Sequence, residues 1–198
     1  IGAVLFWWKG ASDAAAIPPP PPVAPTVTIG DPEPEAPAFE PDPDPWAADV
    51  PEVLEPIHAR LSAGRTLTSR DRSTIRRYVI RERDDPRPWL LLAHGGFLEG
   101  ARTDACDRYG RALDIDVPLV RGDRHALPDL ARMAAHHVVA DCAAALIRQH
   151  WGARALPELD AAIATTPARD EEDLARLHLL RDRIAISATA GVARPQGG

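Results

Sequence analysis

The chain has 198 residues, a formal net charge of −6 and 45% hydrophobic residues, with 21 prolines and two cysteines. Twelve of the prolines lie between residues 18 and 45, a stretch that cannot form a packed core, so the folding part is shorter than the chain. Two cysteines exclude a disulfide-rich scaffold and an all-cysteine zinc site. Residues 11–50 hold eight acids and no base, whereas residues 51–198 hold 22 arginines and 21 acids. This near-neutral folding part argues against a general nucleic-acid binder.

The first residues of the sequence are apolar and end in two tryptophans and a lysine. Residues 1–8 (IGAVLFWW) are too few to cross a bilayer, which takes about 20 helical residues. Trp7 and Trp8 followed by Lys9 are typical of the exit of a membrane helix, because indoles favour the interface and lysine reaches the headgroups. Residues 1–9 are therefore predicted to be the end of a truncated transmembrane helix. The alternatives are a signal-peptide remnant and a frayed hydrophobic terminus.

Residues 10–49 are predicted to form a disordered linker rich in proline and acidic residues. The run Pro18–Pro22 favours the extended polyproline II form, and the alternation of acids with prolines adds charge repulsion. Such a spacer would hold a domain away from a membrane. A ligand for a proline-binding module is the alternative, but a bare run of prolines is weak evidence for it.

From about residue 50 the apolar residues recur at spacings of three and four, which predicts helices throughout and no strand. Thr68 with Asp71 resembles a capping box, and the acids at 170–173 are typical of a helix start. Gly95-Gly96 follows no strand, so it is interpreted as a close helix crossing rather than a phosphate loop. The expected helices cover residues 51–63, 69–83, 87–98, 101–115, 126–135, 137–150, 153–164 and 170–187.

Self-comparison indicates an internal repeat. Shifting the chain by 31 residues aligns Tyr78 with Tyr109, and a period in the thirties is typical of stacked helix pairs. Within residues 86–118 the spacing W-x2-L-A, then A-x3-Y-x2-A and a closing proline, resembles a tetratricopeptide repeat. The positions that support this resemblance, with two from the preceding unit, are Leu61, Tyr78, Trp89, Leu92, Ala93, Ala105, Tyr109, Ala112 and Pro118.

The predicted fold class is therefore all-α, with antiparallel helix pairs stacked as a short α-solenoid similar to tetratricopeptide (TPR) and HEAT repeats. Residues 50–120 are expected to form the TPR-like repeats and residues 121–188 further HEAT-like hairpins. Residues 189–198 are expected to be a disordered tail. Whether the second set of hairpins continues the solenoid or forms its own bundle stays open.

Candidates for chemistry are few. His137 and Asp141 are four residues apart on one predicted helix, a spacing that two metal ligands can use, but no HExxH or CxxC motif accompanies them. Cys106 and Cys142 could pair in an oxidising compartment, although burial as small apolar residues is favoured. The sequence contains no GxSxG motif and no kinase signature. No catalytic residue, cofactor or metal site is predicted, and the residues present are not expected to form an enzyme.

One helix is rich in arginine and could bind an anionic partner. Guanidinium groups can bind phosphates or carboxylates in a bidentate manner, yet neighbouring acids offset the charge, so a solvated helix face is favoured over a nucleic-acid site. The residues of this possible anionic-partner face are Arg70, Arg76, Arg77 and Arg81.

The resemblance to TPR domains implies a non-catalytic scaffold that binds a protein or peptide in a helical groove; no small-molecule ligand is indicated. The order of membrane helix, proline-rich linker and degenerate helical repeats also resembles the C-terminal region of bacterial membrane-anchored serine/threonine protein kinases. That resemblance implies an extracytoplasmic regulatory or sensing domain at the inner membrane. The alternative is a stand-alone anchored scaffold for envelope assembly, and a single lysine beyond the anchor does not fix the membrane side.

Overall fold

The computed structural model describes residues 41–192 of the chain. The expected membrane-helix end at 1–9 and the linker over 10–40 lie outside the described residues, as does the tail from 193 onward. Among the helices that are described, none combines the length and the apolar character needed to span a bilayer.

Every regular element in residues 41–192 is a helix, which confirms the all-α class. The elements are α1 (Glu55–Ser62), α2 (Ser69–Arg81), α3 (Arg87–Leu98), α4 (Arg102–Ile115), α5 (Val117–Arg121), α6 (Ala126–Ala135), α7 (Ala140–His150), the 3-10 helix η1 (Gly152–Ala155), α8 (Leu156–Thr165) and α9 (Glu171–Val192).

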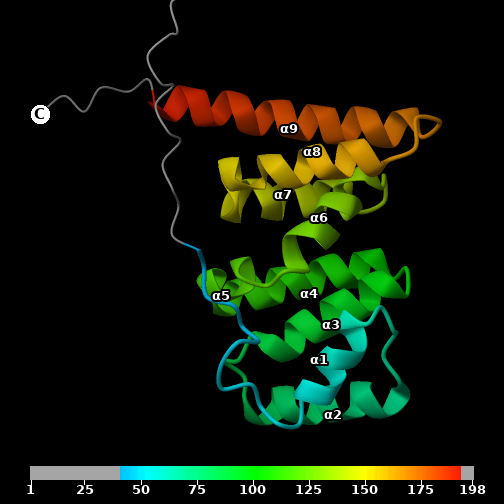
Figure 1. Cartoon of the computed structure of the whole chain (residues 1–198), viewed down its shortest axis with the longest axis vertical. Coiled ribbons are helices and arrows are strands. Elements are labelled where there is room, and N and C mark those ends of the chain that lie inside the picture. Colours follow the sequence, from blue (N-terminus) through cyan, green and yellow to red (C-terminus); the bar gives the residue numbers. More distant parts are fainter. Residues whose placement is uncertain (1–40, 193–198) are drawn as a thin grey trace, which may run out of the picture. The chain divides into compact units, whose positions relative to one another are not determined.

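The helices lie in layers, one pair above another (Figure 1). α3 packs on α4, α6 on α7 and α8 on α9, and α1 and α2 cover the other side of α3. Within the last pair, α8 and α9 run in opposite directions across the picture, because the short loop between them reverses the chain. Consecutive elements therefore form neighbouring layers from α2 at one end to α9 at the other.

Local signals in the sequence explain where several helices begin. Thr68 and Asp71 form the predicted capping box at the start of α2, each side chain accepting the other residue's backbone amide. Asp116 accepts the amide of Leu119 at the start of α5. The Asp123 side chain accepts hydrogen bonds from two backbone amides, that of His125, just before α6, and that of Ala126, the first residue of α6. These carboxylates satisfy amides that have no partner inside their helices.

Two hydrophobic clusters form the interior. The smaller one joins α1, α2 and α3, and its seven buried members among the described residues are all leucine or isoleucine. The larger one extends from α3 to α9, and ten of its buried members are alanines. Trp46 and Trp89 are partly buried against both clusters. The alanines allow close helix approach, which is what stacked helix pairs require.

Several boundaries differ from the prediction. α1 begins at Glu55 rather than at 51, and α9 continues to Val192, into the range expected as a tail. The five-residue helix α5 was not predicted. Pro118, expected to close a repeat, is exposed and is the second residue of α5. Proline fits there, because a residue in the first turn of a helix has no intrahelical partner for its amide.

Residues 42–49, which we call the strap, also differ from the prediction. They fall in the range expected as disordered linker, yet they lie along the helical layers and contact several of them (Figure 1, blue). Residues 42–49 are therefore not a disordered linker, because specific contacts with α3, α5 and η1 fix them.

Candidate functional site

A cavity of about 620 Å3 lies between α4 and α7, and we call it the α4–α7 groove. One wall is formed by α4 residues spaced so that they share a helix face, and the other by α7 residues from Cys142 to His150. Its lining residues are Trp89, Asp104, Cys106, Asp107, Arg108, Gly110, Arg111, Asp114, Cys142, Leu146, Gln149 and His150. The volume is within the range typical of ligand sites in proteins.

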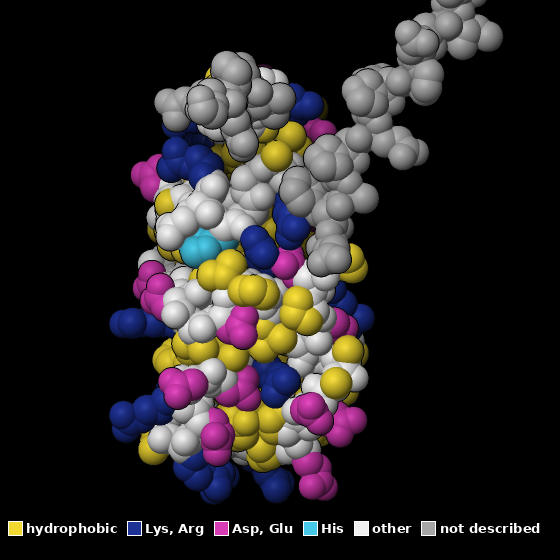
Figure 2. All heavy atoms as spheres, turned by 90° about the vertical axis from the view of Figure 1, so that its left-hand side faces the viewer, with side chains coloured by type: hydrophobic (Ala, Val, Ile, Leu, Met, Phe, Trp, Pro, Cys, Tyr) yellow, Lys and Arg dark blue, Asp and Glu magenta, His cyan; other side chains and the backbone are white. Residues whose placement is uncertain are grey.

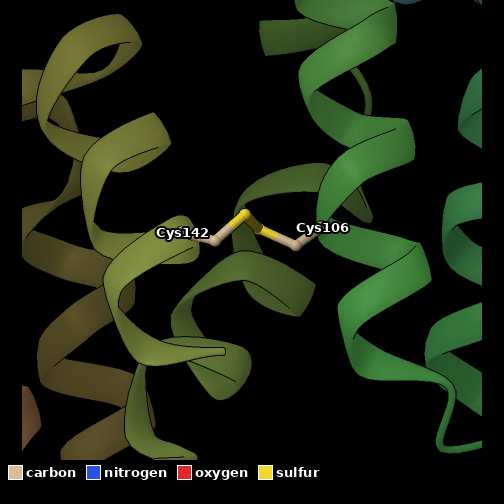
Figure 3. The surroundings of a disulfide bond; sticks show 2 residues. All are labelled: Cys106 and Cys142. Atoms are coloured by element: carbon tan, nitrogen blue, oxygen red, sulfur yellow. A yellow bond between two sulfur atoms is a disulfide. The ribbon is translucent and has the colours of Figure 1, made fainter. Parts of the chain in front are cut away.

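A disulfide between Cys106 and Cys142 joins the two walls of the groove (Figure 3). Cys106 belongs to α4 and Cys142 to α7, and their side chains point toward each other across the space between the helices. The Cα atoms are 6.5 Å apart, and neither of these cysteines is free. The alternative that the sequence left open, a disulfide, is therefore the one observed, and Cys106 is also fully buried. Periodicity could not reveal the bond, because the cysteines are 36 residues apart and meet only through helix packing.

The groove presents charges of both signs to solvent. Asp104 and Arg108 form an i,i+4 ion pair at 3.3 Å. Asp107, Arg111 and Asp114 are exposed and form no ion pair within residues 41–192. Their charges are therefore available to a ligand.

His150 lies at one end of the groove, at the end of α7. Burial lowers its pKa, an effect that the carboxylate of Asp114 opposes and the guanidinium of Arg121 reinforces. The imidazole is therefore mostly neutral at pH 7 and can act as a hydrogen-bond donor or acceptor.

Apolar contacts are also available along the groove. Trp89 is half-buried and Leu146 is partly exposed, so each offers apolar surface. Gly110 belongs to the α4 wall and faces α7. A methyl group added there would lie 3.9 Å from the Leu146 side chain, which is ordinary contact distance. Together with the mixed charges, these surfaces suit a peptide better than a purely apolar ligand.

The histidine and aspartate whose spacing two metal ligands could use lie elsewhere. His137 and Asp141 line a separate cavity of about 330 Å3, which Arg148, Arg176 and Arg183 border. Within the described part of the chain, no group of three or more potential ligand side chains could hold a metal ion. The guanidinium groups around this cavity also oppose cation binding.

The arginines of α2 lie on the outer face of the first layer. Arg70, Arg76, Arg77 and Arg81 are exposed and form no ion pair with any described residue. Ile80, 69% exposed, lies among them. Figure 2 shows Lys and Arg side chains at the end of the molecule where α2 lies in Figure 1, with acidic side chains beside them.

Most of the residues that support the resemblance to a tetratricopeptide repeat lie in the interior of the domain. Leu61, Ala93, Ala105, Tyr109 and Ala112 are buried. Leu92 is 9% exposed, whereas Tyr78 and Trp89 are half-buried. Gly95 and Gly96 lie in α3, where a methyl group added to Gly95 would come within 2.4 Å of the Leu67 side chain. Leu67 precedes α2, so this contact is with a loop; the approach to another helix is at Gly96, where an added methyl group would lie 3.6 Å from Cβ of Ala105 in α4.

A polar cluster in the larger hydrophobic core was missed by the sequence analysis. The Tyr109 hydroxyl donates to Oδ2 of Asp129 at 2.6 Å, and Nδ1 of His94 lies 2.6 Å from the same oxygen. The ring of His94 stacks on that of His125, with centroids 4.1 Å apart. Burial is the main cause that raises the pKa of Tyr109 well above its ordinary value, and the negative charge of Asp129 adds to the increase. The available signal was Tyr109 itself, because a buried tyrosine hydroxyl needs a partner.

This cluster is buried, which separates it from the groove. Asp129 is 2% exposed and His94 is 8% exposed. Since a substrate could not reach the carboxylate or the phenol, the cluster fixes the packing of α3, α4 and α6 and is not an open acid–base site.

Comparisons with known proteins found no similarity: no protein-family model matches the sequence, and no curated protein or solved structure matches the chain. A function for the domain must therefore be argued from the geometry of the α4–α7 groove.

Proposed function

We propose that the helical domain is a non-catalytic module that binds a peptide segment of a protein partner in the α4–α7 groove. The observation on which this depends is the groove itself, a cavity of about 620 Å3 with unpaired charges of both signs on one wall. A peptide provides the complementary ammonium, carboxylate and apolar groups in a single ligand. A disulfide at its base keeps the two walls in register, which reduces the entropic cost of binding.

The spacing of charges supports a peptide ligand. Asp107, Arg111 and Asp114 recur along one face of α4, so their signs alternate over about two helical turns. A segment of opposite alternation would pair with all three. Trp89 and Leu146 would contact its apolar side chains, and aromatic residues contribute strongly at such interfaces.

The resemblance to TPR domains supports the same class of function, because those repeats bind peptides between stacked helix pairs. The disulfide supports a location in an oxidising compartment, since such bonds persist outside the bacterial cytoplasm. We therefore place the domain on the extracytoplasmic side of a bacterial inner membrane, tethered by a membrane helix and the linker. In this setting it is the regulatory part of a membrane-anchored serine/threonine protein kinase.

The alternative is a stand-alone anchored scaffold for envelope assembly. The coding sequence upstream of Ile1 distinguishes the two. A kinase domain there favours the receptor-like protein, whereas a start codon within about a dozen apolar codons favours the small scaffold.

Peptide selection from a random display library tests the groove directly. The full chain is used as bait, and the affinity of selected peptides is then measured for a charge-reversal variant, Arg111→Glu with Asp114→Arg. We expect affinity to fall at least tenfold, because each reversal replaces an attraction with a repulsion.

The matched control reverses one arginine and one aspartate outside the groove, Arg132→Glu with Asp141→Arg, and should leave affinity within about twofold. Equal losses in both variants, or no loss in either, would place the peptide site elsewhere. Circular dichroism of each variant checks that the helices are intact.

A further inference from the structure

The strap is bound at one end through a carboxylate held by two arginines. Oδ1 of Asp42 lies 2.8 Å from a guanidinium nitrogen of Arg121, and Oδ2 lies 2.7 Å from one of Arg154. Asp42 is mostly buried by these contacts, its side chain being 17% exposed. Nε of Arg121 is itself buried and has no hydrogen-bond partner within the described residues. Two arginines that converge on one carboxylate form an anion-recognition site.

The middle of the strap is bound through a tryptophan. Nε1 of Trp46 donates to Oδ2 of Asp123 at 2.7 Å. The indole ring stacks on His58, with centroids 4.1 Å apart and an interplanar angle of 7°. Pro45, which precedes it, is fully buried. An indole that is stacked on one face and hydrogen-bonded at its edge is recognised by shape and by polarity.

The strap backbone also contacts the helical domain directly. A methyl group added to Gly122 would lie 2.0 Å from the carbonyl oxygen of Pro43, so only glycine leaves room for the strap there. Arg87 donates to the carbonyl oxygens of Pro45 and Asp49 at 2.9 and 3.2 Å. These contacts are made to the strap backbone, so they do not depend on the identity of its side chains.

The groups that hold the strap come from separate parts of the helical domain. We call them the seat: His58 of α1, Arg87 of α3, Arg121 of α5, Gly122 and Asp123 of the α5–α6 connection, and Arg154 of η1. We propose that the seat is a peptide-binding site for an Asp-Pro-x-Pro-Trp segment that ends in a turn, and that residues 42–46 are its tethered, exchangeable occupant. The seat is a second site, distinct from the α4–α7 groove.

Two features of the strap allow exchange. Its only hydrogen bonds within itself join Trp46 and Ala47 to Asp44, so no helix must unfold when it leaves. Segments with few backbone hydrogen bonds open locally at lower free energy than the core. The strap is attached to the domain at α1, and its effective concentration is therefore of millimolar order. A free segment competes with it only when the strap is weakened or displaced.

The test uses the full chain and a fluorescent peptide with the sequence of residues 41–50. The strap variant combines Asp42→Asn with Trp46→Ala. We expect the peptide to bind this variant at least tenfold more tightly than it binds the unmodified chain. The reason is that the weakened strap no longer competes for the seat. A peptide in which the tryptophan is replaced by alanine should not bind.

Two further substitutions locate the binding. Adding Gly122→Ala to the strap variant should abolish peptide binding, because the new methyl group occupies the position of the peptide backbone. The conformation at Gly122 has φ −75°, which alanine adopts without strain. Arg169→Ala, which shortens an exposed side chain in the α8–α9 loop, outside the seat and the groove, should leave peptide binding unchanged.

Three results would overturn the proposal: equal peptide affinity in the strap variant and the unmodified chain, insensitivity to Gly122→Ala, or loss of helical circular dichroism in the strap variant. The last result would make the strap an integral part of the fold.

Hydrogen exchange in the unmodified chain is independent of these variants. The indole proton of Trp46 should exchange at least tenfold faster than the amide of Met133 in α6, and equal rates would also contradict exchange of the strap.

Discussion

The two hydrophobic clusters of the domain are built in different ways. The cluster of α1, α2 and α3 consists of leucine and isoleucine side chains that interlock. The larger cluster, from α3 to α9, uses many alanines, a buried tyrosine and a disulfide. Large aliphatic residues stabilise by the apolar area they bury, about 25 cal/mol per Å2. Alanines bury little area each, so the larger cluster also depends on a covalent cross-link and a buried hydrogen-bond cluster.

The largest expected effect is on the disulfide of the larger cluster. The variant Cys106→Ser with Cys142→Ser should lose about 3–4 kcal/mol of unfolding free energy, because the bond closes a loop of 36 residues in the unfolded chain. Urea unfolding followed by circular dichroism measures the loss. A reductant should produce the same change in the unmodified chain and none in the variant. An unchanged midpoint would mean that helix packing alone stabilises these layers.

A smaller effect is expected from the buried tyrosine. Tyr109→Phe removes one of the two groups that hydrogen-bond Asp129, a buried carboxylate, and should cost about 1–3 kcal/mol. The matched variant Tyr78→Phe removes a hydroxyl bound to Asp85 in a partly exposed setting, and should cost about 1 kcal/mol or less. Chemical unfolding of both variants compares the two positions. Equal losses would show that burial of the cluster does not determine its contribution.

The pH dependence of stability should sharpen the comparison, because one histidine, His58, stacks on Trp46 of the strap and another, His125, stacks on His94 of the buried polar cluster. Burial lowers the pKa of His58 and of His125 below the ordinary 6.5; Asp123 opposes this effect, while His94 and Arg124 reinforce it. A histidine with a lowered pKa in the folded state binds protons more readily when unfolded. Stability should therefore be retained above pH 6.5 and fall as the pH drops below it toward the folded-state pKa.

Urea midpoints at pH 7.5 and 5.5 measure this loss of stability. His58→Gln and His125→Gln should each reduce the difference between the two midpoints. A difference that stays the same in both variants would assign the pH dependence to other groups.

The smallest effect is expected on the outer face of α2. Arg76→Ala with Arg77→Ala should change the unfolding free energy by no more than about 0.5 kcal/mol, because both side chains are exposed and unpaired among the described residues. We also expect no oligonucleotide binding by the unmodified chain. Salt-sensitive binding that this variant abolishes would instead identify the face as an anion site.

The sequence by itself determined the helices and many of their ends. α3 and α6 begin and end where periodicity and flanking residues place them, and the capping box at Thr68 is present. These features depend on residues within a few positions of one another, so a linear pattern contains them. α5 was missed because a helix of five residues is too short to show a period.

Part of the candidate site could be anticipated in the same way. Trp89 and Tyr109 stand out through the repeat spacing, but the groove that Trp89 borders does not, because its two walls belong to different helix pairs. The partner of Tyr109 is 20 residues away, in α6.

Only the tertiary structure decided which distant residues meet. Cys106 and Cys142 pair because α4 and α7 lie side by side, and Asp42 reaches Arg154 across 112 residues of sequence. Trp46 meets Asp123 only because the strap follows the layers that the helices create. Local propensity is encoded over a turn or two of helix, whereas these contacts exist only once the layers are stacked. The disulfide, the groove and the seat therefore belong to the fold and not to any single segment.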